Sequence, residues 1–228
     1  DPEPLFYKFN KHENQIFDDT IRLLVLEFTY ARYKPLTYYE GKREQREVQS
    51  QKNLARFMMI LMVKRLESSF YAFRLTLDRF IHSYERVITE FRKGNVYLSK
   101  KHISKLFELL EEDNQEEIER LLAEEKAERL SAKDFSADFI KHLESDLKIL
   151  RSIRKLWEKV RRDPKWESFR DILRSQSKLK KSKVIIFTES KETAEYLAER
   201  IRKEVEPKVI MFCGQAGEAA HRDVINNF

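Results

Sequence analysis

Apolar residues recur every three or four positions along most of this chain, which is the periodicity of amphipathic helices. The longest stripe covers residues 51–91 and ends before Lys93, Gly94 and Asn95, where the glycine can cap a helix. If this helix is unbroken, its roughly forty residues form a rod roughly 60 Å long at ~1.5 Å per residue. A rod of this length needs partners for its apolar face, so the pattern predicts a bundle of long helices.

Similar stripes on either side of this segment supply those partners. One covers residues 17–33 and ends before Pro35, and the other covers residues 135–160 with Ser136 as its N-cap. Residues 99–130 predict two shorter helices, the second of which is acidic. The pattern therefore predicts a helical region.

The pattern changes after Arg162. Asp163 followed by Pro164 is an N-cap with proline at the first helical position, and a short amphipathic helix is predicted to follow. Residues 175–183 are polar and basic, which is typical of a linker.

Two short apolar runs follow the linker. Residues 184–187 (VIIF) and 209–212 (VIMF) are wholly apolar and contain β-branched residues, which predicts buried strands. Between them, residues 188–190 predict a turn, Ser190 is the expected N-cap of a helix, and Pro207 ends the connection. A strand, a helix and a strand at this spacing predict a right-handed βαβ unit with parallel strands.

This predicted βαβ unit is incomplete. Two parallel strands and one helix cannot cover both faces of a sheet, so we expect the chain to stop inside an α/β domain or to borrow packing from its helical part. The predicted fold class is mainly α with a small α/β part: a long-helix bundle followed by the truncated unit. We expect a helical region over residues 1–162, a helix and basic linker over residues 163–182, and the α/β part over residues 183–228.

Composition fits a folded protein of the cytoplasm. Among 228 residues, 16 are Phe, 9 Tyr and 2 Trp, which are more large apolar side chains than disordered chains carry. No apolar run approaches about 18 residues, so a membrane-spanning helix is not expected. Cys213 is the single cysteine, which removes any intrachain disulfide, and residues 1–10 lack the pattern of a signal peptide.

Charge is distributed unevenly along the chain. The net charge is +6, from 45 Lys and Arg against 39 Asp and Glu. Residues 51–100 carry 10 basic and 4 acidic side chains and residues 151–182 carry 12 and 4, whereas residues 101–150 carry 8 and 14. Basic clusters suit a polyanion, because neutralised phosphates release counterions. Solvated helix faces, or pairing between the opposite blocks, explain the same pattern without a partner.

The sequence contains no complete catalytic site. Its four glycines are too scattered for a phosphate-cradling GxxxxGK[ST] loop. They are Gly41, Gly94, Gly214 and Gly217. The five histidines are widely spaced and none pairs with Cys213 at ligand spacing, which argues against a structural zinc. We expect no catalytic residue, cofactor or metal in this chain.

The segments after Arg162 stand in a specific order. They read DPKWESFRDIL, a basic linker, KVIIFTESKETAEYLAERI, VIMFCG and HRDVINNF. In this order they resemble the start of the second RecA-like domain of superfamily 2 helicases, particularly the Swi/Snf-like DNA translocases. Residues 184–187 match the strand called motif IV, and Gly214 matches the glycine after the second strand. The ending approximates an Arg-x-x-x-Ile-x-x-Phe pattern with one residue fewer before the isoleucine, through Arg222, Ile225 and Phe228.

A second stretch with a similar resemblance lies upstream. KRLESSFYAF, over residues 64–73, resembles part of the helical region between the two motor lobes of bacterial Swi/Snf-like helicases. Lys64 and Arg65 are expected on a solvated helix face. Residues 67–69 interrupt the apolar stripe, which suggests a side that meets another lobe or DNA.

The resemblance implies nucleic-acid contacts at the start of the helix after motif IV. In the family this region approaches the nucleic-acid backbone, so the candidate phosphate contacts are Thr188, Ser190, Lys191 and Thr193. Backbone N–H groups and hydroxyls at a helix N-terminus also suit anions on physical grounds. Simple capping of the helix by Ser190 and Thr193 is an equal alternative.

Two further candidates follow from the same resemblance. Gly214 permits a tight strand exit near the same groove, or it is purely conformational. Arg222 contacts phosphate, or it pairs with a neighbouring acid.

The resemblance implies a fragment of an ATP-dependent Swi/Snf-like DNA helicase or translocase. Residues 1–162 would be the inserted inter-lobe helical region and residues 183–228 the opening of the second motor lobe. Expected partners are duplex DNA, the first motor lobe and the rest of the second lobe, with no membrane. ATP and Mg²⁺ are expected only for the intact parent, since nothing here resembles the ATP-binding loop, the acidic Mg²⁺ motif or the arginine that reaches ATP.

Two other interpretations stay open. The chain fits a helical protein-interaction or scaffolding module with an unrelated α/β end. It also fits an RNA helicase or a restriction-system helicase subunit, which would share the motor lobe and differ in substrate.

Overall fold

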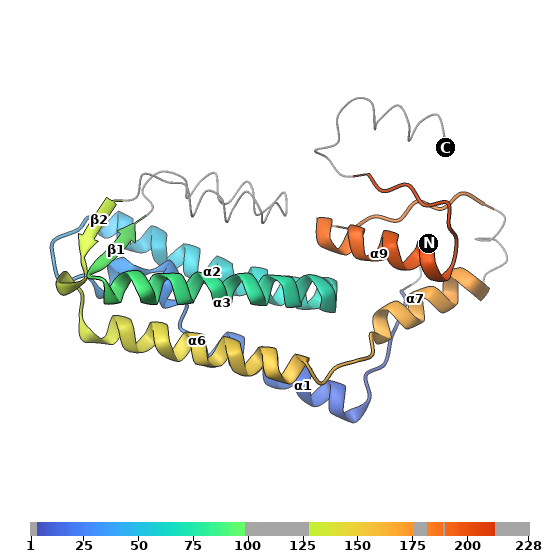
Figure 1. The fold of residues 1–228 in the computed structure, drawn as a ribbon, viewed down its shortest axis with the longest axis horizontal. Coiled ribbons are helices and arrows are strands. Elements are labelled where there is room, and N and C mark those ends of the chain that lie inside the picture. The colour runs from blue at the N-terminus through green and yellow to red at the C-terminus, as the bar shows by residue number, and fades with distance from the viewer. Residues whose placement is uncertain (1–3, 99–127, 176–181, 189, 213–228) are drawn as a thin grey trace. The chain divides into compact units, whose positions relative to one another are not determined.

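The computed structural model describes residues 4–98, 128–175, 182–188 and 190–212, and this part of the chain is mainly helical (Figure 1). The chain divides into two compact units. The helical unit is Lys11–Val160, and the terminal unit combines Asp1–Asn10 with Arg161–Phe228. Among the described residues, no helix is both long and apolar enough to cross a membrane.

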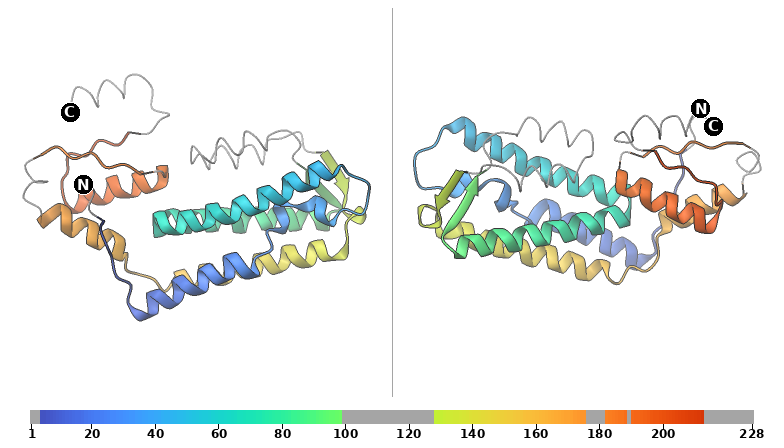
Figure 2. Two further views of the ribbon diagram at one scale, coloured as in Figure 1. Left: turned by 180° about the vertical axis from the view of Figure 1, so that it is seen from behind. Right: turned by 45° about the horizontal axis from the view of Figure 1, so that its top comes forward.

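Long helices dominate the helical unit. Helix α3 packs against both α2 and α6, and Figures 1 and 2 show the three running along one another, with a two-stranded sheet at one end. The elements are α1 (Lys11–Arg22), α2 (Gln45–Ser68), α3 (Phe70–Arg92), β1 (Asn95–Leu98), β2 (Glu128–Ser131) and α6 (Ala137–Trp157). Short turns complete it: η1 (Leu23–Glu27), η2 (Ala31–Tyr33), η3 (Pro35–Tyr38) and η4 (Ala132–Asp134).

Trp157 closes the core at the end of α6. Its ring meets Phe70 and Phe73 of α3 edge-on, with ring centroids 4.7 and 5.4 Å apart. The indole Nε1 donates a 2.9 Å hydrogen bond to Thr20 Oγ1 of α1, so the buried indole N–H has an acceptor. Aromatic packing and one hydrogen bond thus join three helices.

The apolar stripe over residues 51–91 does not form one continuous rod, because the helix breaks at Ser69. This residue is extended, with φ −155° and ψ 150°, between the end of α2 and the start of α3. Its hydroxyl accepts a 3.0 Å hydrogen bond from the N–H of Ala72 and caps α3. The apolar stripe therefore belongs to two helices packed against each other; of the polar residues 67–69, the first two end α2 and Ser69 alone joins it to α3.

Arg65 is buried, which differs from the solvated position predicted for it. Lys64 is exposed as expected, but Arg65 is only 2% exposed. It follows Leu61 by four positions on the inner face of α2, because the buried stripe passes through both residues. Helical periodicity places this arginine inside even though its side chain is charged.

The helix predicted over residues 17–33 ends early, and Asp146 explains why. Helix α1 gives way to the π-helical turn η1, and the chain then leaves helical geometry at Phe28. The buried carboxylate of Asp146 in α6 accepts hydrogen bonds from the N–H groups of Thr29 (2.7 Å) and Ala31 (2.9 Å). These bonds hold a turn in which Tyr30 is left-handed, with φ 55°.

Asp146 also accepts hydrogen bonds from two hydroxyl groups. The hydroxyl of Tyr84 in α3 donates to its carboxylate at 3.0 Å, and so does the hydroxyl of Thr29. Burial raises the pKa of Asp146, while the hydrogen bonds from these donors oppose that rise. One carboxylate thus ties α6, α3 and the turn after η1 together.

The predicted end of the long helical stripe is confirmed. Helix α3 stops at Arg92, and Gly94 adopts φ 89° with its N–H bonded to the carbonyl of Phe91 at 2.9 Å. Strand β1 follows and pairs antiparallel with β2, from Asn95 opposite Ser131 to Leu98 opposite Glu128. The residues 128–130, predicted as helix, are therefore strand, because β1 supplies the ladder partners. The remainder of the two helices predicted between 99 and 130 lies outside the described residues.

Helix α6 is confirmed within the predicted range 135–160. Ser136 occupies its N-cap position, but the serine side chain makes no capping hydrogen bond there. The carbonyl of Ser136 instead accepts from the N–H of Phe139 at 3.0 Å.

The terminal unit contains α7 (Pro164–Ser175) and α9 (Lys191–Glu204). Asp163 caps α7 as predicted, since its Oδ1 accepts from the N–H of Trp166 at 3.0 Å. The helix predicted between the apolar runs is likewise present as α9. The final segments, including Cys213 and Gly217, lie outside the described residues.

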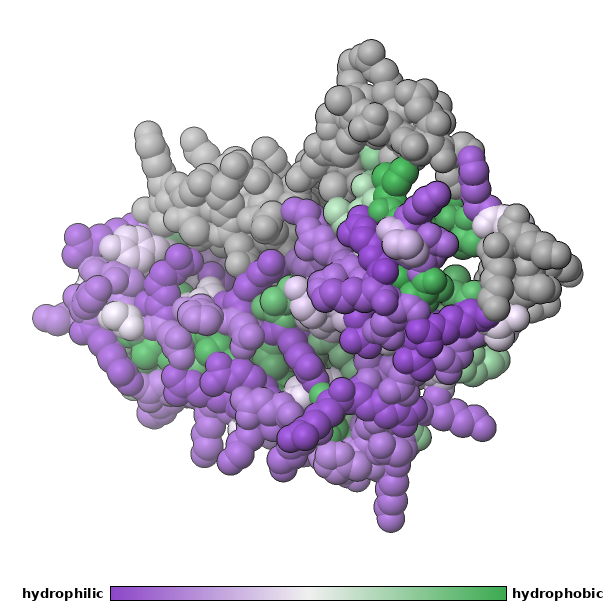
Figure 3. Space-filling view, turned by 45° about the vertical axis from the view of Figure 1, so that its right-hand side comes forward, coloured by the Kyte–Doolittle hydropathy of each residue, from purple (hydrophilic) through white to green (hydrophobic). Residues whose placement is uncertain are grey.

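The two apolar runs differ from the prediction. Residues 184–187 are exposed, with Phe187 89% exposed, and residues 209–212 include the exposed Ile210 and Phe212. Neither run is a strand, and no backbone hydrogen bond joins them within the described part of the chain. A parallel βαβ unit is therefore absent there, because the runs lack the neighbouring strands that would cover and pair them. Figure 3 shows hydrophobic side chains at the surface of the terminal unit.

Candidate nucleic-acid interface

Ser190 organises the start of α9. Its backbone is extended, with φ −115° and ψ 123°, and its Oγ accepts from the N–H of Thr193 at 3.3 Å. Its carbonyl accepts from the N–H of Ala194 at 2.9 Å, and its own N–H donates to Thr188 Oγ1 at 3.3 Å. These bonds confirm Ser190 as the N-cap predicted from sequence.

The structure separates the four candidate phosphate contacts into two pairs. Ser190 is 2% exposed and Thr193 is also buried, whereas Thr188 and Lys191 are exposed. The other two candidates, Gly214 and Arg222, lie outside the described residues. A solvent-borne phosphate can therefore reach Thr188 and Lys191 more directly than the buried pair.

Glu192 changes the electrostatics of this helix start. It is buried in the first turn, and its Oε2 accepts a 3.2 Å hydrogen bond from Ser190 Oγ. A carboxylate here complements the positive end of the helix dipole and is the charge that a phosphate would otherwise supply. The geometry thus gives Ser190 a capping role and leaves the exposed Lys191 as the cation of this site.

A cluster around Trp166 positions α9 against α7. The buried indole donates from Nε1 to Glu204 Oε2 at 3.3 Å, and the guanidinium of Arg200 lies 5.1 Å from its ring centroid. The hydroxyl of Tyr196 donates to Asp163 Oδ2 at 2.8 Å. Burial, with the charge of Asp163 nearby, raises the pKa of Tyr196. Asp163 therefore caps α7 and anchors α9 at once.

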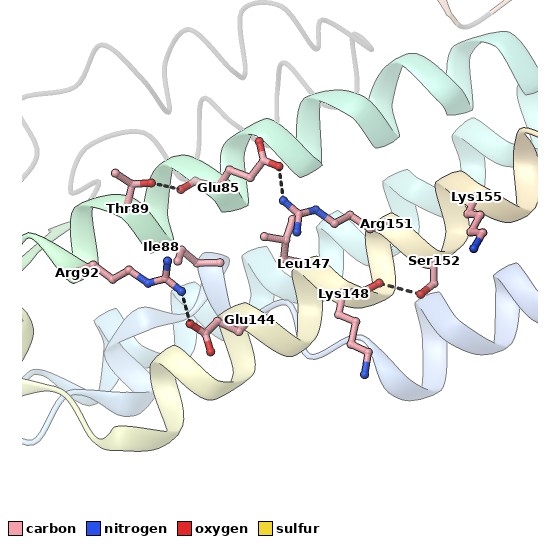
Figure 4. A pocket seen from close by; sticks show the side chains of 10 residues that line it. All are labelled: Glu85, Ile88, Thr89, Arg92, Glu144, Leu147, Lys148, Arg151, Ser152 and Lys155. Carbon is pink, nitrogen blue, oxygen red and sulfur yellow. Dashed lines mark hydrogen bonds and ion pairs between the residues drawn. The ribbon is translucent and has the colours of Figure 1, made fainter.

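The helical unit carries a groove between α3 and α6 that sequence analysis did not identify. Its volume is about 500 Å³, and Figure 4 shows its lining. The floor includes the buried Ile88 and Leu147, and charged side chains form the rim. The lining residues are Glu85, Ile88, Thr89, Arg92, Glu144, Leu147, Lys148, Arg151, Ser152 and Lys155.

Two ion pairs cross this groove. Arg92 Nη2 of α3 lies 2.7 Å from Glu144 Oε1 of α6, and Arg151 Nη2 of α6 lies 2.7 Å from Glu85 Oε1 of α3. Each pair is exposed, so its contribution to stability is small, about 0–1 kcal/mol. The sequence signals near this site were the basic excesses of residues 51–100, which include Arg92, and of residues 151–182, which include Arg151 and Lys155.

Metal-ligating side chains do not gather in threes anywhere in the described part of the chain. Comparison with protein-family models, with curated proteins and with solved structures finds no match to this chain. The helicase resemblance of residues 163–228 and 64–73 therefore stays a prediction from sequence.

Proposed function

We propose that this chain is part of an ATP-dependent DNA helicase or translocase of the Swi/Snf-like type. It contributes nucleic-acid contacts and coupling between the motor lobes, and it does not hold a complete ATPase site. Lys11–Val160 would be the helical region between the lobes, and the terminal unit would contain the opening of the second lobe.

The order of segments in residues 163–212 carries the proposal. A helix capped by Asp163, a basic linker, an apolar run, a helix capped by Ser190 and a second apolar run follow one another. In Figures 1 and 2 each run heads from the C-terminal end of α9 toward its N-terminal end, and a βαβ unit requires this alternation of direction. Within a complete sheet, added strands would cover the apolar runs that are exposed here.

A scaffolding module is the second candidate, and one observation favours it. The apolar runs do not pair with each other in the described residues, so they offer apolar surface for a protein partner as readily as for the strands of a motor lobe.

Salt-dependent binding separates the two candidates. We would measure the affinity of the full chain for labelled duplex DNA and duplex RNA by fluorescence anisotropy between 50 and 200 mM salt, a range over which about six phosphate contacts lower affinity by roughly 10³. A translocase segment should bind DNA more tightly than RNA, with a steep salt slope. Absence of a salt-dependent complex with DNA would refute the proposal.

Two matched variants of α9 sharpen this test. Lys191→Gln removes the exposed cation at the helix start, and Lys203→Gln removes a lysine at the other end, where it pairs with Glu199. If the helix start contacts phosphate, the first variant should make the salt slope less negative by about 0.9, and the second should leave it unchanged. Equal slopes in both variants would remove this site from the proposal.

ATP turnover tests the proposal that this chain does not hold a complete ATPase site. The isolated chain should release no phosphate from ATP with or without duplex DNA, because Mg²⁺, phosphate-cradling donors and an arginine must converge for phosphoryl transfer. DNA-stimulated turnover by the chain alone would contradict it.

A further inference from the structure

We propose that the α6 edge of the groove between α3 and α6, formed by Lys148, Arg151 and Lys155, binds the phosphate backbone of duplex DNA. This inference rests on the proposed function and names a second contact surface, in the helical unit. The family resemblance assigned none of these residues. Their charge, their spacing and their surroundings support this role.

The groove carries an excess of two positive charges. Its four cations face two carboxylates, and both carboxylates are occupied by the arginines of the crossing ion pairs. Lys148 and Lys155 supply the excess, and neither forms an ion pair with an acidic side chain in the described part of the chain. The two paired guanidinium groups keep further N–H donors, since an arginine has five and each pair uses few of them.

The two lysines lie on one edge of α6. Figure 4 shows both extending from α6 away from α3, whereas Arg92 and Arg151 reach across the groove. They are seven residues apart, so about 10 Å separates their positions along the helix axis. Duplex DNA presents one charge per ~1.7 Å of its axis, so a row of this length faces several phosphates. A small anion would meet only one of the lysines.

The same edge lacks what a protein partner needs. Protein interfaces depend on aromatic or aliphatic anchors that are accessible before binding. The apolar residues of this groove, Ile88 and Leu147, are buried under the charged rim. Phosphate contacts need cations alone, and flexible lysines accept many phosphate geometries.

A paired substitution tests the proposal. K148Q/K155Q removes the two unpaired cations, and K52Q/K64Q removes two exposed lysines of α2 as the matched control. For the full chain and a labelled duplex, the first variant should make the salt slope less negative by about 1.8 and weaken binding about 60-fold at 0.1 M salt. The control should keep the wild-type slope. Equal thermal midpoints for both variants would show that each is folded.

Chemical protection provides a second readout that needs no variant. Duplex DNA should protect Lys148 and Lys155 of the wild-type chain from amine acetylation, while Lys52 and Lys64 stay reactive. Poly-glutamate at equal charge concentration should protect them less.

Each outcome has a distinct meaning. A complex with DNA that is insensitive to K148Q/K155Q and leaves both lysines reactive would overturn this inference and leave the proposed function standing. Equal protection by poly-glutamate would assign the edge to an acidic polypeptide and would overturn it too. If no complex with DNA forms at any salt concentration, the proposed function itself fails.

Discussion

The two units differ in how far their large apolar side chains are buried. The helical unit encloses Phe73 and Trp157 and gives the buried Asp146 several hydrogen-bond donors. In the terminal unit α7 and α9 share the buried Trp166, but Phe187 remains 89% exposed. The helices of the first unit bury one another's apolar faces, whereas a strand of a parallel sheet needs a paired neighbouring strand and cover on both faces. Apolar residues thus form an enclosed core in the helical unit, whereas part of them stays exposed in the described residues of the terminal unit.

Removing the buried carboxylate of Asp146 should strongly destabilise the helical unit. Asp146→Ala leaves the N–H groups of Thr29 and Ala31 and the hydroxyl of Tyr84 without their acceptor. At about 1–3 kcal/mol for each of these three orphaned donors, we expect a loss of about 3–9 kcal/mol in unfolding free energy, measured by urea denaturation. Asp138→Ala on the same helix is the control, since Asp138 is exposed and pairs with the exposed Lys141. Similar losses in both variants would show that Asp146 does not hold the turn.

Trp166→Ala tests whether the terminal unit has a core of its own. The substitution removes the ring that lies between α7 and Arg200 and should cost about 3–4 kcal/mol within that unit. Hydrogen exchange should then accelerate in α7 and α9 while protection in α3 and α6 is unchanged. Trp157→Ala should give the reverse pattern, and a uniform change in both units would contradict separate cores.

Two serines at equivalent helix starts should respond differently. Ser190→Ala removes a side-chain cap of α9 and should destabilise the terminal unit by about 1 kcal/mol. Ser136→Ala should have almost no effect, because that side chain makes no capping bond at the start of α6. Hydrogen exchange of each helix during thermal denaturation would measure the stability lost in each variant. Equal losses would mean that the presence of a serine matters and the observed capping bond does not.

The smallest expected effect concerns Phe187. Phe187→Asp should change stability by less than about 0.5 kcal/mol, because the side chain is already in solvent. Binding of a hydrophobic dye to the chain should fall. Phe73→Asp, at a fully buried position, should unfold the helical unit. A large loss from Phe187→Asp would mean that residues 184–187 are covered in solution.

Sequence patterns predicted the helices well where local signals decide. Asp163 with Pro164, Ser190 and Gly94 each marked a helix boundary that the structure confirms, because capping depends on neighbouring residues alone. The break at Ser69 escaped detection since the apolar stripe continues at nearly the same phase through two packed helices. The early end of α1 escaped too, because Asp146 acts on Thr29 from 117 residues away.

The candidate site was predictable only in part. Periodicity gave the start of α9 and the residues at its cap, but burial of Ser190 and Thr193 depends on packing that no local pattern contains. The groove cations come from α3 and α6, which are far apart in the sequence, so only their packing brings Arg92 and Arg151 beside the same opening.

The ladder between β1 and β2 has a consequence for how this molecule tolerates added sequence. Leu98 and Glu128 are direct partners in the ladder, so the two ends of the segment between them are adjacent. Lengthening such a connection raises its closure entropy by only about 0.6 kcal/mol per doubling. This end of the bundle is thus a natural attachment point, where an accessory segment can grow or shrink without any helix having to move.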